Sequence, residues 1–142
     1  MSESIDGASV GRITVALRIA GDTVDPAAIT ERLGIAPTFA AKQGEAVWRR
    51  ERTLIQRHGV WSHALTAHAE SGAELDDAIV TLLARFPADE ALWADLAGAH
   101  DVGLFCGLFL TDDNQGADLR STTLQALAAR HLTLSLDIYS AS

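Results

Sequence analysis

The sequence predicts an α+β domain, with one mainly antiparallel sheet of about five strands and amphipathic helices packed on one face of it. Three observations predict this fold class. Residues 12–20 and 132–139 alternate apolar and polar side chains, as strands with one buried face do. Residues 74–86 instead repeat their apolar side chains at the spacing of an amphipathic helix. The longest uninterrupted apolar run, residues 102–111, is too short to cross a bilayer and fits a central buried strand.

The order of the expected elements refines this prediction. Along the chain they follow as β-α-β-β-α-α-β-α-β, so we expect a ferredoxin-like βαββαβ core extended by a C-terminal helix and strand. The length of 142 residues, with 48% hydrophobic and 21% charged residues, suits one globular domain. We place this single domain at residues 12–142 and expect residues 1–11, which are small and polar, to be a disordered lead-in.

The first strand and the first helix have clear boundaries. The strand over residues 12–20 ends at Gly21, which interrupts its alternation. Asp25 then occupies an N-cap position, Pro26 the first helical position, and Gly34 the position that closes a helix. We therefore predict a short helix between Pro26 and Gly34.

Two further strands are expected before the long helix. One lies within residues 44–50, around Val47 and Trp48, and the other covers residues 60–67. The highly charged residues 49–59 between them indicate a long hairpin loop or an irregular strand. Because the two strands follow one another along the chain, we expect them to pair with each other in an antiparallel ladder.

The clearest helix begins near Ser71 and ends at Pro87. Ser71 and Glu74 have the spacing of a capping box, and proline cannot continue a helix. The apolar side chains of this helix are expected in the core: Leu75, Ile79, Leu82, Leu83 and Phe86.

Two more helices flank the central strand, and a last strand follows. A short helix is expected over residues 89–98. A longer one over residues 121–131 is expected to direct inward Leu124, Leu127 and Ala128. The last strand, residues 132–139, alternates Leu132, Leu134, Leu136 and Ile138 on one side, and we expect the first three of these to meet the helices.

The central strand, residues 102–111, has two unlike faces. One face consists of Val102, Leu104, Cys106, Leu108 and Leu110, and we expect the helices to cover it. The other face alternates Gly103, Phe105, Gly107 and Phe109. Aromatic residues mixed with one charge of each sign are typical of binding or subunit surfaces. We therefore predict an interface on the sheet face opposite the helices, with the candidates Arg18, Phe105, Phe109, Asp137 and Tyr139.

Several stretches of the sequence resemble those of one bacterial family. The matching stretches are DPAAITERLGIAPT, KQGE, HGVWS and the terminal LDIYS, of which Gly44-Glu45 and Trp61-Ser62 are the most distinctive. The family is a domain of unknown function, number four-two-seven-nine in its series, and the resemblance covers residues 12–140. It implies a single soluble bacterial domain, and it implies no activity and no catalytic residue.

A basic segment with two tryptophans is the candidate ligand site. Residues 42–68 hold five basic and two acidic side chains, so this segment is net +3 in a chain of net charge −8. Arginine binds carboxylates and phosphates in bidentate fashion, and indole rings stack on guanidinium groups. The candidate residues are Trp48, Arg49, Arg50, Arg52, Trp61 and His63. The alternative is a solvent-exposed charged hairpin with both tryptophans in the core.

Other chemistries lack a supporting pattern. His58, His63 and His68 do not have metal-ligand spacing, and the acidic loop 112–118 does not match a calcium-binding loop. Neither a nucleophile elbow nor a phosphate-binding glycine loop is present. Cys106 cannot form an internal disulfide, and among leucines its thiol is expected to be inert. We predict neither a metal nor a cofactor, and no catalytic residue.

The charge and the hydropathy narrow the class of protein. A net charge of −8 argues against binding to nucleic acid, which requires a basic surface. The N-terminal residues lack the apolar core of a signal peptide, and no apolar stretch is long enough to span a membrane. We expect a soluble cytoplasmic protein that does not bind membranes.

Two function classes follow from these observations. The favoured one is a non-enzymatic interaction module that forms a homodimer or binds a protein partner, for example as an inhibitor of another bacterial protein. The net negative charge suits a basic partner. The alternative is a binder of a small anion, or an enzyme, that uses the segment 42–68. A concave pocket with a tryptophan and two convergent arginines would favour that alternative.

Overall fold

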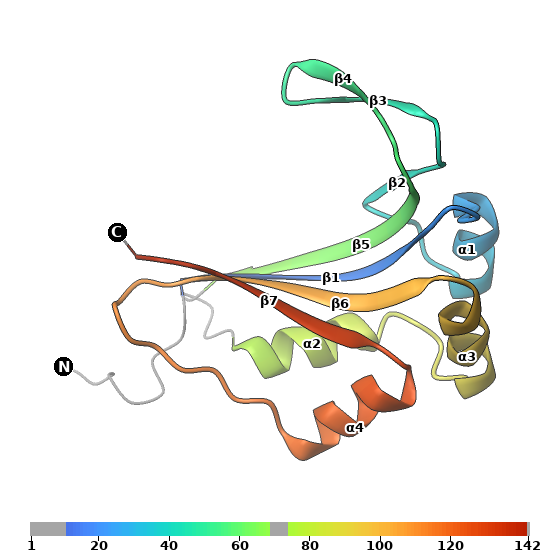
Figure 1. Ribbon diagram of the computed structural model, residues 1–142. Helices are drawn as coiled ribbons and strands as arrows, with labels where there is room; N and C mark the ends of the chain where they lie inside the picture. The colour runs from blue at the N-terminus through green and yellow to red at the C-terminus, as the bar shows by residue number, and fades with distance from the viewer. Residues whose placement is uncertain (1–10, 69–73, 142) are drawn as a thin grey trace.

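The chain forms two layers, a curved sheet and a set of helices on one face of it (Figure 1). The computed structural model describes residues 11–68 and 74–141. The α+β fold class and the mainly antiparallel sheet of five strands are confirmed. The predicted disordered lead-in lies outside the described residues except for Gly11.

Four long strands and one short strand build the main sheet, in the order β2-β5-β1-β6-β7. Within the described residues, β6 and β7 pair in parallel and the other neighbouring strands of this sheet pair antiparallel. The strands are β1 (Arg12–Gly21), β2 (Phe39–Ala41), β5 (Gly59–His68), β6 (Asp101–Phe109) and β7 (Thr133–Tyr139). A separate two-stranded hairpin consists of β3 (Ala46–Arg49) and β4 (Arg52–Ile55).

The strand connections differ from those expected. β1 lies between β5 and β6 and is antiparallel to both, and the parallel strands β6 and β7 are adjacent. A ferredoxin-like core splits its βαβ units by inserting another strand, so that topology is not confirmed. The expected pairing of the strand around Trp48 with the strand over residues 60–67 is wrong. β3 instead pairs with β4, because the chain turns back at Arg50 and Glu51, and β5 pairs with β1 and β2.

The helices begin and end close to the predicted positions. They are α1 (Pro26–Leu33), α2 (Leu75–Leu83), α3 (Glu90–Ala99) and α4 (Ser121–Ala129). Gly34 closes α1 in the left-handed conformation, with φ of 75°, as its position predicts. The Asp89 side chain caps α3 by accepting a hydrogen bond from the Ala91 amide at 3.0 Å. Ser71, the first residue of the predicted capping box, lies outside the described residues.

One continuous core lies between the sheet and the helices. β1 alternates four buried residues, Ile13, Val15, Leu17 and Ile19, with residues on the other face. β6 adds Leu104, Cys106 and Leu108, and α2 adds Ile79, Leu82 and Leu83. These three groups were expected to meet, and they do. Phe86 packs edge to face against both Trp61 and Trp93 at the β5 side of this core.

Two predictions about the last helix and strand are wrong. In α4, Leu127 is buried as expected, but Leu124 and Ala128 are exposed and Thr123 takes an inward position. In β7, Leu134 packs against the core and Leu132 just before it is buried, as expected, but Leu136 is 50% exposed, and Ile138 on the same side is 57% exposed. The reason is that β7 is an edge strand and α4 lies beneath only its first part, so the second part of β7 extends past the helix layer (Figure 1).

Candidate functional site

The candidate site is the sheet face that the helices leave open, which we call the open face. The register of the strands decides which residues lie there, because residues paired across a ladder share a face. Arg18 pairs with Gly103 and Ser62, Ala16 pairs with Phe105, and Phe105 pairs with Ser135. All five interface candidates from the sequence lie on this face: Arg18, Phe105, Phe109, Asp137 and Tyr139. Their role in binding stays a prediction.

Stacked rings cover one end of the open face. The rings of Phe109 and Tyr139 lie parallel, with centroids 4.4 Å apart, and the Arg12 guanidinium lies 3.8 Å from the Phe109 centroid. A side chain on Gly107 would touch both rings, since its Cβ would be 3.5 Å from Phe109 and 3.8 Å from Tyr139. The rings of Phe109 and Tyr139 from the same chain therefore occupy the space above Gly107, and this space does not take a ring of a partner.

The tyrosine hydroxyl is tied to a carboxylate on the same strand. Tyr139 donates a hydrogen bond of 2.6 Å to Asp137. This hydrogen bond and the negative charge of Asp137 raise the pKa of Tyr139 above its usual value. Tyr139 thus stays a neutral hydrogen-bond donor. The Asp137 carboxylate already accepts a hydrogen bond from the same chain.

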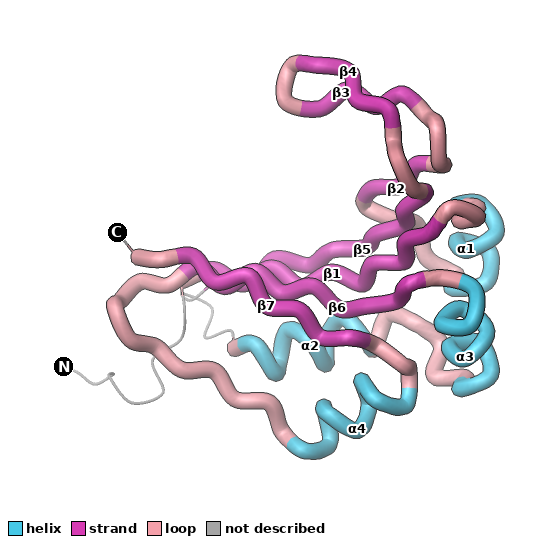
Figure 2. Tube along the Cα trace, viewed as in Figure 1, coloured by secondary structure: helices cyan, strands magenta, loops and turns pink. Residues whose placement is uncertain are grey.

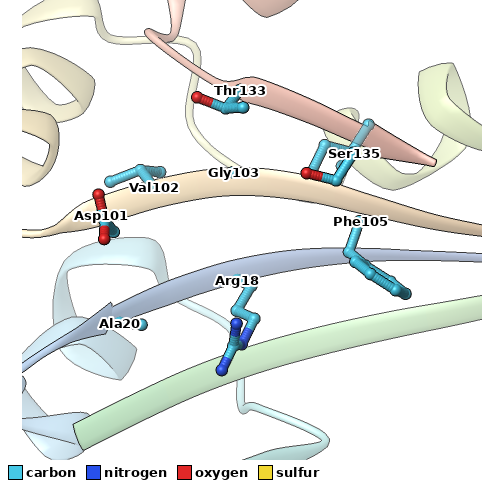
Figure 3. A pocket seen from close by; sticks show the side chains of 9 residues that line it. Arg18, Ala20, Asp101, Val102, Gly103, Phe105, Thr133 and Ser135 are labelled. Atoms are coloured by element: carbon cyan, nitrogen blue, oxygen red, sulfur yellow. The ribbon is translucent and has the colours of Figure 1, made fainter. Parts of the chain in front are cut away.

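A hollow of ≈ 230 Å³ lies on the open face where β6 and β7 begin, and among its lining residues are Arg18, Asp101, Gly103, Phe105 and Ser135 (Figure 3). In Figure 3 the side chains of Arg18 and Phe105 extend in the same direction from adjacent strands, toward β5. A Cβ on Gly103 would lie 3.1 Å from the Thr133 carbonyl oxygen. The absence of a side chain at Gly103 therefore leaves the hollow open at this point. Among the described residues, Arg18 has no ion-pair partner.

A second hollow of ≈ 390 Å³ continues the first one toward the start of β5. Both are lined by Arg18, Ala20 and Asp101, and the second adds Arg57 and His58. Arg57 is also without an ion pair in the described part of the chain. The two hollows together form a groove with two guanidinium groups available for an anionic ligand.

The hairpin β3–β4 stands at one side of the open face. It rises from the β2–β5 edge, on the side of the sheet opposite the helices (Figure 2). The Arg49 guanidinium lies 4.6 Å from the ring centroid of Phe39 and helps to hold the hairpin against β2. Trp48 and Ile55 share one face of the hairpin and are 70% and 63% exposed. The hairpin therefore presents a bare apolar face next to its arginines.

The six ligand candidates from the sequence do not form one pocket. Trp48, Arg49, Arg50 and Arg52 belong to the hairpin, whereas Trp61 and His63 lie on the helix side of β5. Trp61 is fully buried, and its indole N–H donates to the Thr30 hydroxyl at 3.0 Å. The alternative interpretation, with both tryptophans in the core, holds for Trp61 only.

His63 is a structural residue of the core. Its Nδ1 donates to the carbonyl oxygen of Ala36 at 2.8 Å, so its Nε2 is the acceptor for the Arg85 guanidinium at 2.9 Å. The neutral imidazole satisfies both partners at once. His63 is 7% exposed and faces away from the hairpin arginines, so it does not contribute to an anion site there.

The charge of the molecule is divided between its two sides. On the open face and the hairpin segment 42–58, the basic residues are Arg12, Arg18, Lys42, Arg49, Arg50, Arg52 and Arg57, and the acidic ones are Glu45, Glu51, Asp101 and Asp137. This side is therefore net +3. The helices with their connecting loops hold, in the described residues, twelve acidic and four basic side chains and are net −8. The open side is thus basic although the chain is acidic.

Two charged residues of the groove, Arg57 and Asp101, were not among the candidates from the sequence. Arg57 was one of several charges in a segment without periodicity, and Asp101 stands at the first position of β6. Both enter the groove through the pairing of β1 with β5 and β6, which places Gly59 opposite Gly21 and Asp101 opposite Ala20. No local pattern in the sequence reveals that register.

The described residues do not point to a metal centre or a membrane-spanning helix. No three His, Cys, Asp or Glu side chains within residues 11–68 and 74–141 gather closely enough to hold a metal ion. In the same ranges, every helix is too short or too polar to cross a bilayer.

Comparison with known proteins gives one match. A family model described as "Domain of unknown function (DUF4279)" matches residues 11–141. No curated protein and no solved structure matches the chain.

Proposed function

Because the chain belongs to the family of domains of unknown function DUF4279, we propose its function from its own surfaces: it is a non-enzymatic interaction module that binds an acidic protein partner. The partner lies on the open face and against the hairpin. We also place the module in the cytoplasm, where its single buried thiol, Cys106, stays reduced.

One observation carries this proposal. The open face lacks a helix cover in the described part of the chain, yet it bears exposed aromatic residues beside arginines without ion-pair partners. Phe105 is 43% exposed and lies next to Arg18, and Trp48 on the neighbouring hairpin is 70% exposed. Aromatic residues and arginine are the residue types enriched at the energetic centres of protein interfaces.

The local charge supports an acidic partner. The net negative charge of the chain suggested a basic one, but a docking partner meets the open side, which is net +3. Charge complementarity acts between the two surfaces in contact, and it increases the association rate and suppresses wrong partners. An acidic segment of a protein can place carboxylates at Arg18, Arg57 and the hairpin arginines at the same time.

The alternative is a binder of a small anion, or an enzyme. Arg18 and Arg57 line one groove, which supports this alternative, but neither tryptophan lines it. The groove is open to solvent, whereas small-molecule sites enclose most of their ligand. A protein segment can cover both the groove and the exposed Trp48, and a small anion can cover only the groove.

The proposal is tested with peptides selected against the purified protein. A phage library of random dodecapeptides is panned in physiological salt, and the most enriched sequences are synthesised. We expect Asp and Glu to be enriched together with apolar residues. Titration calorimetry then compares the wild type with Arg18→Glu and Arg52→Glu. Each reversal should weaken binding by about tenfold or more, which corresponds to about 1.4 kcal/mol.

A matched control separates specific contacts from net charge. Arg32→Glu changes the net charge by the same amount on α1, outside the open face, and removes only an exposed ion pair with Asp95. It should leave the dissociation constant within about twofold of the wild type. Enrichment of neutral or basic peptides, or equal losses in all three variants, would contradict the proposal. Tight binding of free phosphate or of a dicarboxylate without any enriched peptide would favour the small-anion alternative.

A further inference from the structure

The C-terminal helix and strand form a side wall of the domain that is almost free of charge. α4 contains no charged residue, and β7 contains only Asp137. Charged residues make up 21% of the whole chain. Depletion of charge is the main compositional mark of the buried centre of an interface.

The wall exposes large apolar side chains. Leu124 of α4 is 48% exposed, and Leu136 and Ile138 of β7 are 50% and 57% exposed. Leu136 and Ile138 stand in register with Cys106 and Leu108 on β6, which are buried. The apolar core layer thus continues to the outer edge of the sheet and ends there without cover in the described residues.

These side chains lie on the same side of the domain. The hollow between α2 and α4 is lined from α4 by Thr122, Thr123 and Ala126 and from its C-cap by Arg130, so these residues face α2. Helical geometry places Leu124 and Ala128 on the opposite flank of α4. α2 contacts β1 and β5, whereas α4 contacts β7, the last strand of the sheet. The Leu124 flank and the free edge of β7 therefore face outward together.

The backbone of β7 is suited to pairing with another strand. The carbonyl oxygen of Tyr139 accepts a hydrogen bond from Leu110 at 3.0 Å, so Tyr139 directs its polar groups toward β6. Successive residues of a strand direct them to alternate sides. Leu134, Leu136 and Ile138 therefore present their N–H and C=O groups at the free edge.

We propose that two copies of the chain associate through β7, antiparallel about a twofold axis at Leu136, and continue the sheet to ten strands. In this register Leu136 pairs with Leu136 of the second copy, and Ile138 pairs with its Leu134. All three residues with outward N–H and C=O groups gain hydrogen-bonding partners. Asp137 lies opposite Ser135 of the second copy, so the two carboxylates do not face each other. The exposed apolar side chains of the two walls meet on the helix side.

A second copy fits this wall better than a different protein. A twofold interface needs a surface that complements itself, and an apolar strand edge with alternating donors and acceptors does so. Natural edge strands avoid this pairing with lysine, proline or a bulge, and β7 has none of the three. At the other edge of the sheet β2 has only three residues, and the chain leaves it for the hairpin. The inference goes beyond the proposed function, because the open face stays accessible in both copies.

The test compares two substitutions of the same type. Ile138→Lys places a charge in the wall, and Ile55→Lys places one on the hairpin, where the isoleucine is similarly exposed, at 63% against 57%. Light scattering and sedimentation are measured at concentrations up to about 200 µM, where a dimer of even modest affinity is populated. We expect the wild type and Ile55→Lys to have twice the chain mass. Ile138→Lys should weaken dimerisation by about tenfold or more, with an unchanged circular dichroism spectrum.

Several outcomes would overturn the inference. One is a wild type that stays monomeric at both low and high salt, and another is a dimer that Ile138→Lys leaves intact. If Ile138→Lys unfolds, hydrogen exchange of the wild type decides. The Leu134, Leu136 and Ile138 amides should then gain protection as the concentration rises. Protection that is independent of concentration and disappears on deletion of residues 1–10 would instead assign the wall to the chain's own N-terminal segment. Peptide binding at the open face should be unchanged by Ile138→Lys, so the two proposals can fail separately.

Discussion

At the scale of single residues, the central strand shows how position decides the role of a side chain. Cys106 and Phe105 are neighbours in β6, but Cys106 points into the core and is fully buried, whereas Phe105 lies on the open face. Burial raises the pKa of the Cys106 thiol to about 12. The thiolate, which is the reactive form, is therefore scarce at neutral pH.

This gives a prediction for thiol labelling. In the folded protein at pH 8, Cys106 should react with a thiol reagent far more slowly than it does in denaturant, because both the raised pKa and the burial protect it. The absorbance of the released chromophore measures both rates. Rapid stoichiometric labelling of the folded protein would show that β6 is not covered by the helices.

A pair of residues on α2 tests the position of the core. Leu82 is fully buried between the helix layer and the sheet, so Leu82→Ala should lower the free energy of unfolding by about 2–5 kcal/mol. Val80 is 49% exposed on the same helix, and Val80→Ala should change it by less than about 1 kcal/mol. Urea unfolding of both variants measures the difference. Similar effects at the two positions would mean that the buried face of α2 is misassigned.

At the scale of elements, α4 is anchored by a side chain from another helix. Its N-cap position, Arg120, has no capping side chain, and Asp76 of α2 replaces one. The Asp76 carboxylate accepts hydrogen bonds from the Arg120 amide at 2.9 Å and from its guanidinium at 3.0 Å. Burial raises the pKa of Asp76, but these hydrogen bonds, one from Thr123 and the Arg120 charge together hold it below its usual value.

The lowered pKa of Asp76 makes this link dependent on pH. A carboxyl whose pKa is lower in the folded state stabilises the fold above its unfolded pKa, and the stabilisation is lost as the pH falls through the folded pKa. Asp76→Asn should therefore lower the free energy of unfolding by about 1–3 kcal/mol at pH 7. The difference from the wild type should shrink in acid. Asp77→Asn, at an exposed carboxylate, is the control. Equal effects of both variants at every pH would contradict this role.

The elements themselves could be predicted from the sequence much better than their pairing. Periodicity and caps place β1 and α1 within one residue, because these signals are local, whereas α2 is shorter at both ends than the span from Ser71 to Pro87 that its pattern predicts. The hairpin escaped prediction for a physical reason. Its turn residues, Arg50 and Glu51, have φ of 51° and 64°, a conformation that usually requires Asn-Gly. Without that signal, the charged segment indicated a long hairpin loop or an irregular strand, and not two short strands paired with each other.

The residues of the candidate site that lie on the main sheet could be predicted from the sequence, and those on the hairpin could not. Alternation along β1, β6 and β7 is enough to assign Arg18, Phe105 and Tyr139 to one face. Trp48 and Trp61 could not be told apart, since both stand in apolar strand patterns and only the tertiary fold exposes one and buries the other. The same limit applies to Leu136 and Ile138, whose exposure depends on β7 being the edge strand.

At the scale of the whole molecule, the net charge of −8 conceals a division into a basic open side and an acidic helix side. The interaction surfaces divide in the same way: the basic open face and hairpin suit an acidic partner, and the uncharged wall suits a second copy. A twofold dimer through β7 places both open faces on the same side of a ten-stranded sheet. Two acidic segments of one partner could then bind together, which would increase their avidity.

The central claim is that the open face and the hairpin form the docking site for an acidic partner. The most direct measurement is a nuclear magnetic resonance titration of the labelled protein with the selected acidic peptide. We expect the amides of Arg18, Gly103 and Phe105 and the indole N–H of Trp48 to shift, and those of α2 and α4 to stay in place. Shifts confined to the helix side, or to the β7 edge, would contradict the claim.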